Sequence, residues 1–198
     1  SYGTDYPFIA KSNVGSTLKP FLYCHLRDSG IPKKEKFNSY FNELNWLVRE
    51  VNHVKNHLNL EEALFHSNNN VFINACNKKN IDSSLLFLSS IFDRDIKDFF
   101  PSSILGATKS GISLYELAFT YSEYFSSKNL TESKVECLSL LNKIDKDKLG
   151  LTIESILLKT ATTNNNTESY AVLGNPNMTF AHLRNKNPIN DKSKESCF

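Results

Sequence analysis

The sequence predicts an α+β fold in which helices fill most of the chain and a small antiparallel sheet follows them. Apolar residues recur at helical spacing through the first two thirds of the chain. Later, residues 152–163, 168–175 and 178–185 are three strand-like runs separated by the turn-forming stretches 164–166 and 175–177. With 198 residues, of which 40% are hydrophobic, the chain is long enough for one domain with its own core.

The expected helices begin and end at recognisable signals. Asn59 is in position to cap one helix, and Ser113 with Glu116 has the spacing of a capping box. Asp82 or Ser83 is expected to cap another helix. In order, the predicted helices are residues 16–28, 41–58, 59–67, 71–80, 82–92, 113–125 and 133–144.

Composition narrows the function classes. A net charge of +2 without long Lys/Arg blocks does not indicate a nucleic-acid partner. No apolar run has the length of a membrane span. The four cysteines are far apart and form no zinc pattern; three lie in apolar helical surroundings and are expected to be small buried hydrophobes. The asparagine runs 68–70 and 164–166 are typical of solvated loops or turns.

The stretch "VGSTLKPFLY" places Ser16 three residues before Lys19 at a helix start. Residues at this spacing share a helix face, so the lysine can serve as a base for the serine. Backbone N–H groups at the helix start would favour a developing oxyanion. The alternative is that Ser16 caps the helix and Lys19 is a solvated surface lysine. Alone, the pair favours that alternative.

Two later motifs change the balance. Ser67-Asn68-Asn69 follows a short predicted helix, and Lys159-Thr160-Ala161 lies in a predicted strand. The order Ser-x-x-Lys, Ser-x-Asn, Lys-Thr-small is the motif set shared by penicillin-binding proteins and serine β-lactamases.

The flanking segments extend this resemblance from about residue 3 to residue 187. The chain resembles the transpeptidase domain of penicillin-binding proteins, most like the bifunctional high-molecular-weight class. The segments that carry the resemblance are "GSTLKPFLY", "NLEEALFHSNNNVFI", "ILGATKSGISLYELAFTYSEYF" and "KTATTNNNTESYAVLGNPNMTFAHLRNKN". We therefore expect a transpeptidase-like domain over residues 1–187 and a flexible polar tail over residues 188–198.

The resemblance implies a catalytic role for five side chains. Ser16 would be the acylated nucleophile and Lys19 its general base. Ser67 would relay protons between Lys19, Lys159 and the leaving group. Asn69 would hydrogen-bond the substrate backbone or the Lys19 ammonium group.

The third motif would bind the substrate. Thr160, Ala161, Thr162 and Thr163 are the implied substrate-binding residues, with Thr160 and Thr162 near a terminal carboxylate. The backbone N–H groups of Ser16 and Thr162 would form the oxyanion hole.

The implied substrate is a peptidoglycan stem peptide ending in D-Ala-D-Ala, with β-lactams as covalent ligands. An amine or water would resolve the acyl-enzyme, giving transpeptidation or carboxypeptidation. The resemblance implies no metal or organic cofactor and an extracytoplasmic location, in the periplasm or on the cell-wall side.

Two departures from the family pattern support an alternative. Ala161 stands where the family has glycine, and its methyl group is expected to crowd the substrate. Only fifteen residues precede Ser16, so the family's N-terminal strands are expected to be missing from the sheet, or to come from another chain or segment. The alternative is a degenerate, non-catalytic binding or interaction module. A β-lactamase is less favoured, because no glutamate is placed like the deacylating residue of the class A enzymes.

Overall fold

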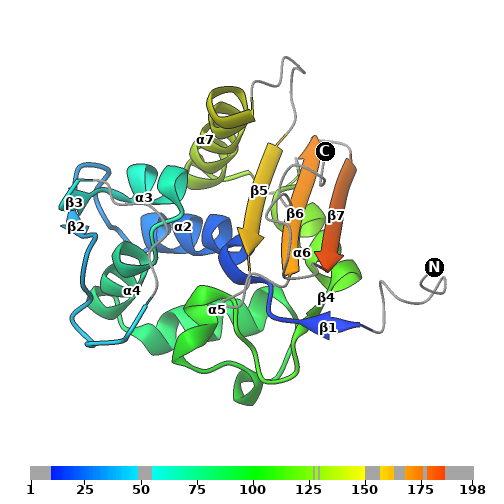
Figure 1. The fold of residues 1–198 in the computed structure, drawn as a ribbon, viewed down its shortest axis with the longest axis horizontal. Coiled ribbons are helices and arrows are strands. Elements are labelled where there is room, and N and C mark those ends of the chain that lie inside the picture. Colours follow the sequence, from blue (N-terminus) through cyan, green and yellow to red (C-terminus); the bar gives the residue numbers. More distant parts are fainter. Residues whose placement is uncertain are drawn as a thin grey trace.

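Helix α2 (Lys19–Asp28) runs through the middle of the molecule, between a sheet on one side and further helices on the other (Figure 1). Most of its residues are buried, including Lys19 at its first position. Pro20 lies in the first turn, where its missing N–H leaves no hydrogen bond unmade. Helices α3, α4, α5 and α7 all pack against α2, which makes it the centre of the core.

The computed structural model describes residues 10–48, 55–126, 128, 130–149, 157–162, 168–175 and 178–185. The expected tail at 188–198 lies outside these residues, as do Thr163 and Cys197. The α-helices of the described part are α2, α3 (Leu60–His66), α4 (Asn69–Lys78), α5 (Ile81–Ile91), α6 (Leu114–Tyr124) and α7 (Glu132–Leu149). Three short 3-10 helices accompany them: η1 (Gly15–Leu18), η2 (Ile96–Asp98) and η3 (Pro101–Leu105).

The sheet is a three-stranded antiparallel meander in the order β5-β6-β7. Its strands are β5 (Leu157–Thr162), β6 (Glu168–Asn175) and β7 (Met178–Asn185). In the register, Lys159 lies opposite Val172 and Gly174 opposite Thr179. The α+β class is confirmed, as are the predicted strands over 157–162, 168–175 and 178–185; residues 152–156 and 163 of the first predicted strand lie outside the described residues. Two short antiparallel pairs complete the described strands: β1 (Lys11–Ser12) with β4 (Ile112–Ser113), and β2 (Phe37–Asn38) with β3 (His57–Leu58).

Two local predictions are confirmed at the caps. The Asn59 side chain accepts a hydrogen bond from the Glu62 N–H, and the Glu62 carboxylate accepts one from the Asn59 N–H, at 2.8 and 3.0 Å. Ser113 and Glu116 form the same reciprocal box at the start of α6. These pairs satisfy N–H groups that a helix start leaves unpaired.

Two other predictions are wrong. Residues 41–48 and 55–56 are not helical, and residues 57–58 form strand β3 instead. The physical reason is that side chains of α4 bind the backbone of the segment that follows β2, as described below. Helix α5 is capped two or three residues earlier than expected, because the Asn80 side chain accepts from the Asp82 N–H at 3.0 Å.

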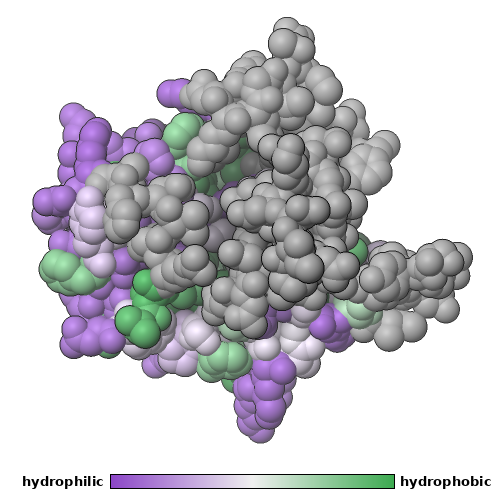
Figure 2. Space-filling model, viewed as in Figure 1, coloured by the Kyte–Doolittle hydropathy of each residue, from purple (hydrophilic) through white to green (hydrophobic). Residues whose placement is uncertain are grey.

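The face seen in Figure 2 carries mainly hydrophilic residues over the described helical part, with separate hydrophobic residues between them. Within the described residues, no helix is both long and apolar enough to cross a membrane.

Candidate active site

A tight turn immediately before α2 presents Ser16. Gly15 has a φ of 56°, in the left-handed region that glycine adopts without strain. Gly106, at the end of η3, lies against this turn so closely that a Cβ placed on it would come within 2.3 Å of the Gly15 backbone. The Val14 N–H donates to the Gly106 carbonyl at 3.0 Å. Two glycines thus let the two backbones meet and fix the turn.

The turn places Ser16 and Lys19 on the same side of the chain, because residues i and i+3 align in a 3-10 helix. Ser16 is half-buried, whereas the Lys19 side chain is 0% exposed. The position that caps α2 belongs to Leu18. The alternative of a capping serine beside a solvated lysine is therefore wrong for both residues.

Helix α6 contacts the same turn from the side of the hydrophobic core. The Tyr121 hydroxyl of α6 donates to the Thr17 carbonyl, and burial raises the pKa of Tyr121 well above its ordinary value. Tyr121 is therefore a neutral donor at ordinary pH. The Thr17 hydroxyl donates to the Val14 carbonyl at 2.8 Å, so the turn keeps its shape through side chains as well as backbone.

Lys19 reaches from α2 to the second motif. Its Nζ donates to the Ser67 carbonyl and, at 2.7 Å, to the Asn69 Oδ1. Ser67 ends α3 in the left-handed conformation, with a φ of 57°, which is uncommon for a residue other than glycine. This reversal turns the Ser67 carbonyl and the Asn69 side chain toward one ammonium group.

Lys159 reaches the same serine from the sheet. Its Nζ donates to the Ser67 Oγ at 2.5 Å and to the Thr160 carbonyl at 2.8 Å. Ser67 therefore bridges two lysines, one bound at its carbonyl and one at its hydroxyl. Four predicted residues, Lys19, Ser67, Asn69 and Lys159, are directly connected, and the turn that carries Ser16 lies against β5.

Strand β5 presents the third motif with the alternation of a strand. Lys159 and Ala161 are buried, at 5% and 4% exposure, while Thr160 is half-buried. Ala161 belongs to the hydrophobic core. Thr162 ends the strand, opposite Ser169. Thr163 lies outside the described residues.

Sequence reasoning missed a second buried network at the same place. The Asn68 side chain accepts from the Val71 N–H at 2.9 Å and donates to the Ser39 carbonyl at 3.1 Å. The Asn70 side chain donates to the same carbonyl at 3.2 Å. Both asparagines are 2% exposed, so the prediction of a solvated run at 68–70 is wrong for these two residues.

The network continues along α4. Asn42 donates to the Asn70 Oδ1 at 2.9 Å, and Asn74 donates to the Asn38 and Phe41 carbonyls at 3.1 and 3.0 Å. We call Asn68, Asn70 and Asn74 the asparagine clamp. Asn70 and Asn74 are four residues apart and share one helix face, and this spacing is the signal that could have indicated a buried polar stripe.

Metal ligands do not gather in the described part of the chain, where no three His, Cys, Asp or Glu side chains form a candidate group. The chemistry of the site is carried by lysine, serine and asparagine side chains.

Comparison with known proteins identifies the fold of the chain. No family model and no curated protein matches the sequence. Solved structures do match. Penicillin-binding protein 1A from Haemophilus influenzae has a TM-score of 0.71 at 14% identity, over 93% of this chain and 40% of that chain. The chain has the penicillin-binding-protein fold.

Two mycobacterial structures agree. The PonA1 protein from Mycobacterium tuberculosis in complex with penicillin V has a TM-score of 0.71 at 15% identity, over 91% of this chain and 61% of that chain. Penicillin-binding protein A from M. tuberculosis, as an imipenem acyl-enzyme complex, has a TM-score of 0.67 at 12% identity, over 92% and 57%. The present chain thus spans between 40% and 61% of the length of these penicillin-binding proteins.

Proposed function

We propose that the chain is a penicillin-binding-type serine acyl-transferase that forms an acyl-enzyme at Ser16 with D-Ala-D-Ala stem peptides. The observation that carries the proposal is the meeting of Lys19 and Lys159 at Ser67, beside the turn that carries Ser16. Three separate sequence motifs contribute to this one cluster.

In the acylation step, the Ser16 Oγ attacks the carbonyl carbon of the penultimate D-Ala. Its proton passes to the Lys19 Nζ, which must be an uncharged amine to accept it. Lys19 is fully buried, and Lys159 contacts the hydroxyl of the same Ser67 whose carbonyl Lys19 contacts. The Ser16 and Thr162 N–H groups are the proposed donors to the oxyanion.

Ser67 is the proposed proton relay to the leaving group. Its hydroxyl accepts from Lys159, and a serine hydroxyl that accepts still has one proton to donate. That proton goes to the nitrogen of the terminal D-Ala as the C–N bond breaks. Lys159 restores the proton to Ser67. When the acyl ester is resolved, the attacking amine or water gives up a proton that restores Lys159 through Ser67, and Lys19 returns its proton to the Ser16 Oγ.

The acyl ester is then resolved by an amine, which forms a cross-link, or by water, which gives carboxypeptidation. Lys159, Thr160 and the backbone at Thr162 are the proposed partners of the terminal carboxylate, because a carboxylate favours cationic and hydroxyl donors. The proposal includes β-lactams as covalent ligands and an extracytoplasmic location, where peptidoglycan lies.

The test measures D-alanine released from an N-acylated tripeptide ending in D-Ala-D-Ala, with and without a D-amino acid as amine acceptor. We expect release by the native chain, none by Ser16→Ala, and unchanged release by the control Ser12→Ala, which removes a half-buried hydroxyl of β1. Incorporation of the acceptor identifies a transpeptidase, and its absence a carboxypeptidase. Equal release by native protein and Ser16→Ala contradicts the proposal.

A second candidate, a non-catalytic binding module, is favoured by one observation. Ala161 stands in the third motif where the family has glycine, and it is buried in β5. If its methyl group prevents the substrate from lying against the strand, the peptide binds without acylation. Binding of the tripeptide with no D-alanine release from native protein is the result that this candidate predicts.

A further inference from the structure

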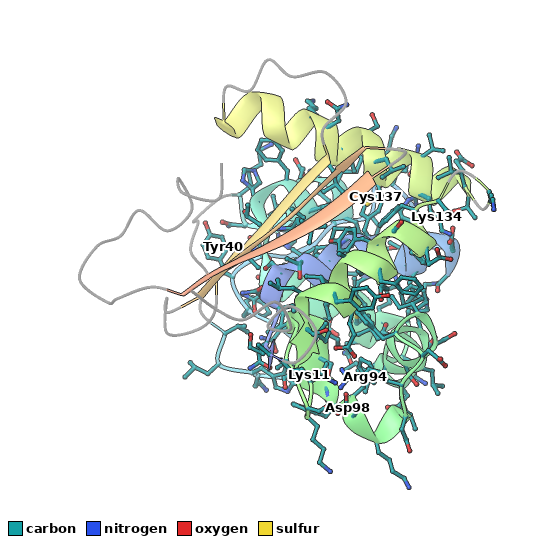
Figure 3. The ribbon with its side chains drawn as sticks, turned by 90° about the vertical axis from the view of Figure 1, so that its right-hand side faces the viewer. Lys11, Tyr40, Arg94, Asp98, Lys134 and Cys137 are labelled. Atoms are coloured by element: carbon teal, nitrogen blue, oxygen red, sulfur yellow. The ribbon has the colours of Figure 1, made fainter. Side chains whose placement is uncertain are left out.

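Two buried cysteines face each other where α2 and α7 cross. Cys24 lies on α2 and Cys137 on α7, and both thiols are free and 0% exposed. Figure 3 labels Cys137 on α7. The two helices pack directly against each other, although their cysteines are far apart in the sequence.

The contacts of the two thiols are reciprocal. The Cys24 Sγ donates to the Ser133 carbonyl at 3.7 Å, and the Cys137 Sγ donates to the Pro20 carbonyl at 3.6 Å. Ser133 lies four residues before Cys137, and Pro20 lies four residues before Cys24. Each thiol thus contacts a carbonyl that lies one helical turn before the other cysteine. This places the two side chains together across the interface of α2 and α7.

The protonation behaviour of the pair agrees with this placement. Burial raises the pKa of Cys137 well above its ordinary value, and a hydrogen bond to the Cys24 side chain and the charge of Cys24 raise it further. A thiol in this state is a poor nucleophile, so the closed, folded dithiol reacts slowly. Oxidation has to occur while the helices are still assembling.

We propose that Cys24 and Cys137 form a disulfide during folding, which links α2 to α7. In the reaction, one thiolate attacks a small-molecule disulfide such as oxidised glutathione and releases its first thiol. The second cysteine then attacks the mixed disulfide and releases the second thiol. The two cysteines lose two protons and two electrons, and the reagent disulfide is reduced to two thiols.

The disulfide would act on the proposed active site through the elements that it joins. Helix α2 begins with Lys19, while α7 packs against β5, which carries Lys159. The link would close a long chain segment and hold these two elements together. Oxidation is expected to raise the Tm on the order of 10 °C, because a long closed loop restricts the unfolded chain most.

The pair has an internal control in Cys76. This thiol on α4 is also buried, and burial raises its pKa to about 12 while the neighbouring Ser84 lowers it. Cys76 is therefore as buried as Cys24 and Cys137, but among the described residues it does not face another cysteine as they do.

The test refolds the native chain in a glutathione redox buffer, alkylates the remaining thiols and maps peptides without reduction. We expect a single peptide pair joined through Cys24 and Cys137, a mass lower by two hydrogen atoms and a raised Tm that a reductant abolishes. Cys76→Ser should keep the link, and Cys24→Ser and Cys137→Ser should lose it. The proposal is overturned if both Cys24 and Cys137 are alkylated in refolded protein that has the native circular dichroism spectrum. A link to another cysteine or an unchanged Tm also overturns it.

Discussion

The two sides of the Ser67–Asn70 stretch have opposite properties. Ser67 and Asn69 turn toward the lysines of α2 and β5, whose amino groups donate to the Ser67 carbonyl and hydroxyl and to the Asn69 Oδ1. The side-chain amides of Asn68 and Asn70 donate to the Ser39 carbonyl. Adjacent residues of one short stretch therefore contact the lysine cluster on one side and the backbone after β2 on the other.

The comparison shows how a charged cluster can be held in place without further charges. Neutral amides that satisfy buried carbonyls position the stretch without adding a net charge near the lysines. We therefore expect substitutions on the lysine side to change reactivity more than stability, and substitutions in the asparagine clamp to do the reverse.

The largest effect is expected for Lys19→Met, which keeps a long buried side chain but removes the base. Acylation by benzylpenicillin should slow by about 10³-fold, in the range of general-base catalysis. The Tm should fall only modestly, because methionine keeps the buried apolar contacts while the Ser67 carbonyl and the Asn69 Oδ1 lose one donor. A rate within tenfold of the native value would show that Lys19 is not the base.

Ser67→Ala should have the next largest effect. It removes the hydroxyl that Lys159 binds but leaves the backbone carbonyl that Lys19 binds. Acylation should fall by about 10²-fold, and stopped-flow or quenched mass measurements would give the rate. Unchanged acylation with slower release of D-alanine would assign Ser67 to a different step.

On the supporting side, Asn70→Ala should lower the free energy of unfolding by about 2 kcal/mol, since it removes one of the two acceptors of the buried Asn42 amide and one donor to the Ser39 carbonyl. Acylation by the folded fraction should change less than tenfold. Urea titration combined with the acylation rate separates the two effects. A large loss of acylation rate in Asn70→Ala with unchanged stability would contradict the expectation that the asparagine clamp affects stability more than reactivity.

Ala161→Gly tests the third motif between these extremes. Because Ala161 is part of the core, its removal should cost about 1 kcal/mol of stability, as glycine does within a strand. The acylation rate should change only a few-fold. A rate increase above tenfold would show that the methyl group obstructs the substrate, as the sequence suggested.

The smallest effect concerns pH at α3, the helix that ends at Ser67. The hydrogen bond from the Asn59 N–H lowers the pKa of Glu62 below its ordinary value, with help from Lys55. A lowered folded-state pKa stabilises the protein above the unfolded-state pKa, and this contribution is lost as the pH falls through the folded-state pKa. Compared with Glu62→Gln, the native Tm advantage should therefore shrink on acidification. An advantage that grows with acid would contradict this assignment.

Much of the fold followed from local patterns. The three strands combine alternating residues with strong turn signals, and Asn59 and Ser113 cap helices through contacts only three residues away. The predicted helix at 41–58 failed in its described part because Asn70 and Asn74 of α4 bind the Asn42 side chain and the Phe41 carbonyl from a distance. Such tertiary hydrogen bonds override a helical pattern.

The site itself was predicted by motif order, and its geometry was not. Nothing local indicates that Lys19 bonds to residues 48 and 50 positions later, because that contact depends on the left-handed end of α3. The clamp was missed for a related reason. Asparagine is equally common in solvated turns and in buried caps, and only the packing of α4 distinguishes them.

The central claim is that Ser16 is a nucleophile activated by this cluster. Intact mass after incubation with benzylpenicillin tests it most directly. Native protein is compared with Ser16→Ala, after an unchanged Tm has shown that the variant is folded. The account predicts one penicilloyl adduct on the native chain, mapped to Ser16, and none on the variant. Folded native protein that stays unmodified at saturating drug, or an adduct that persists in Ser16→Ala, would contradict it.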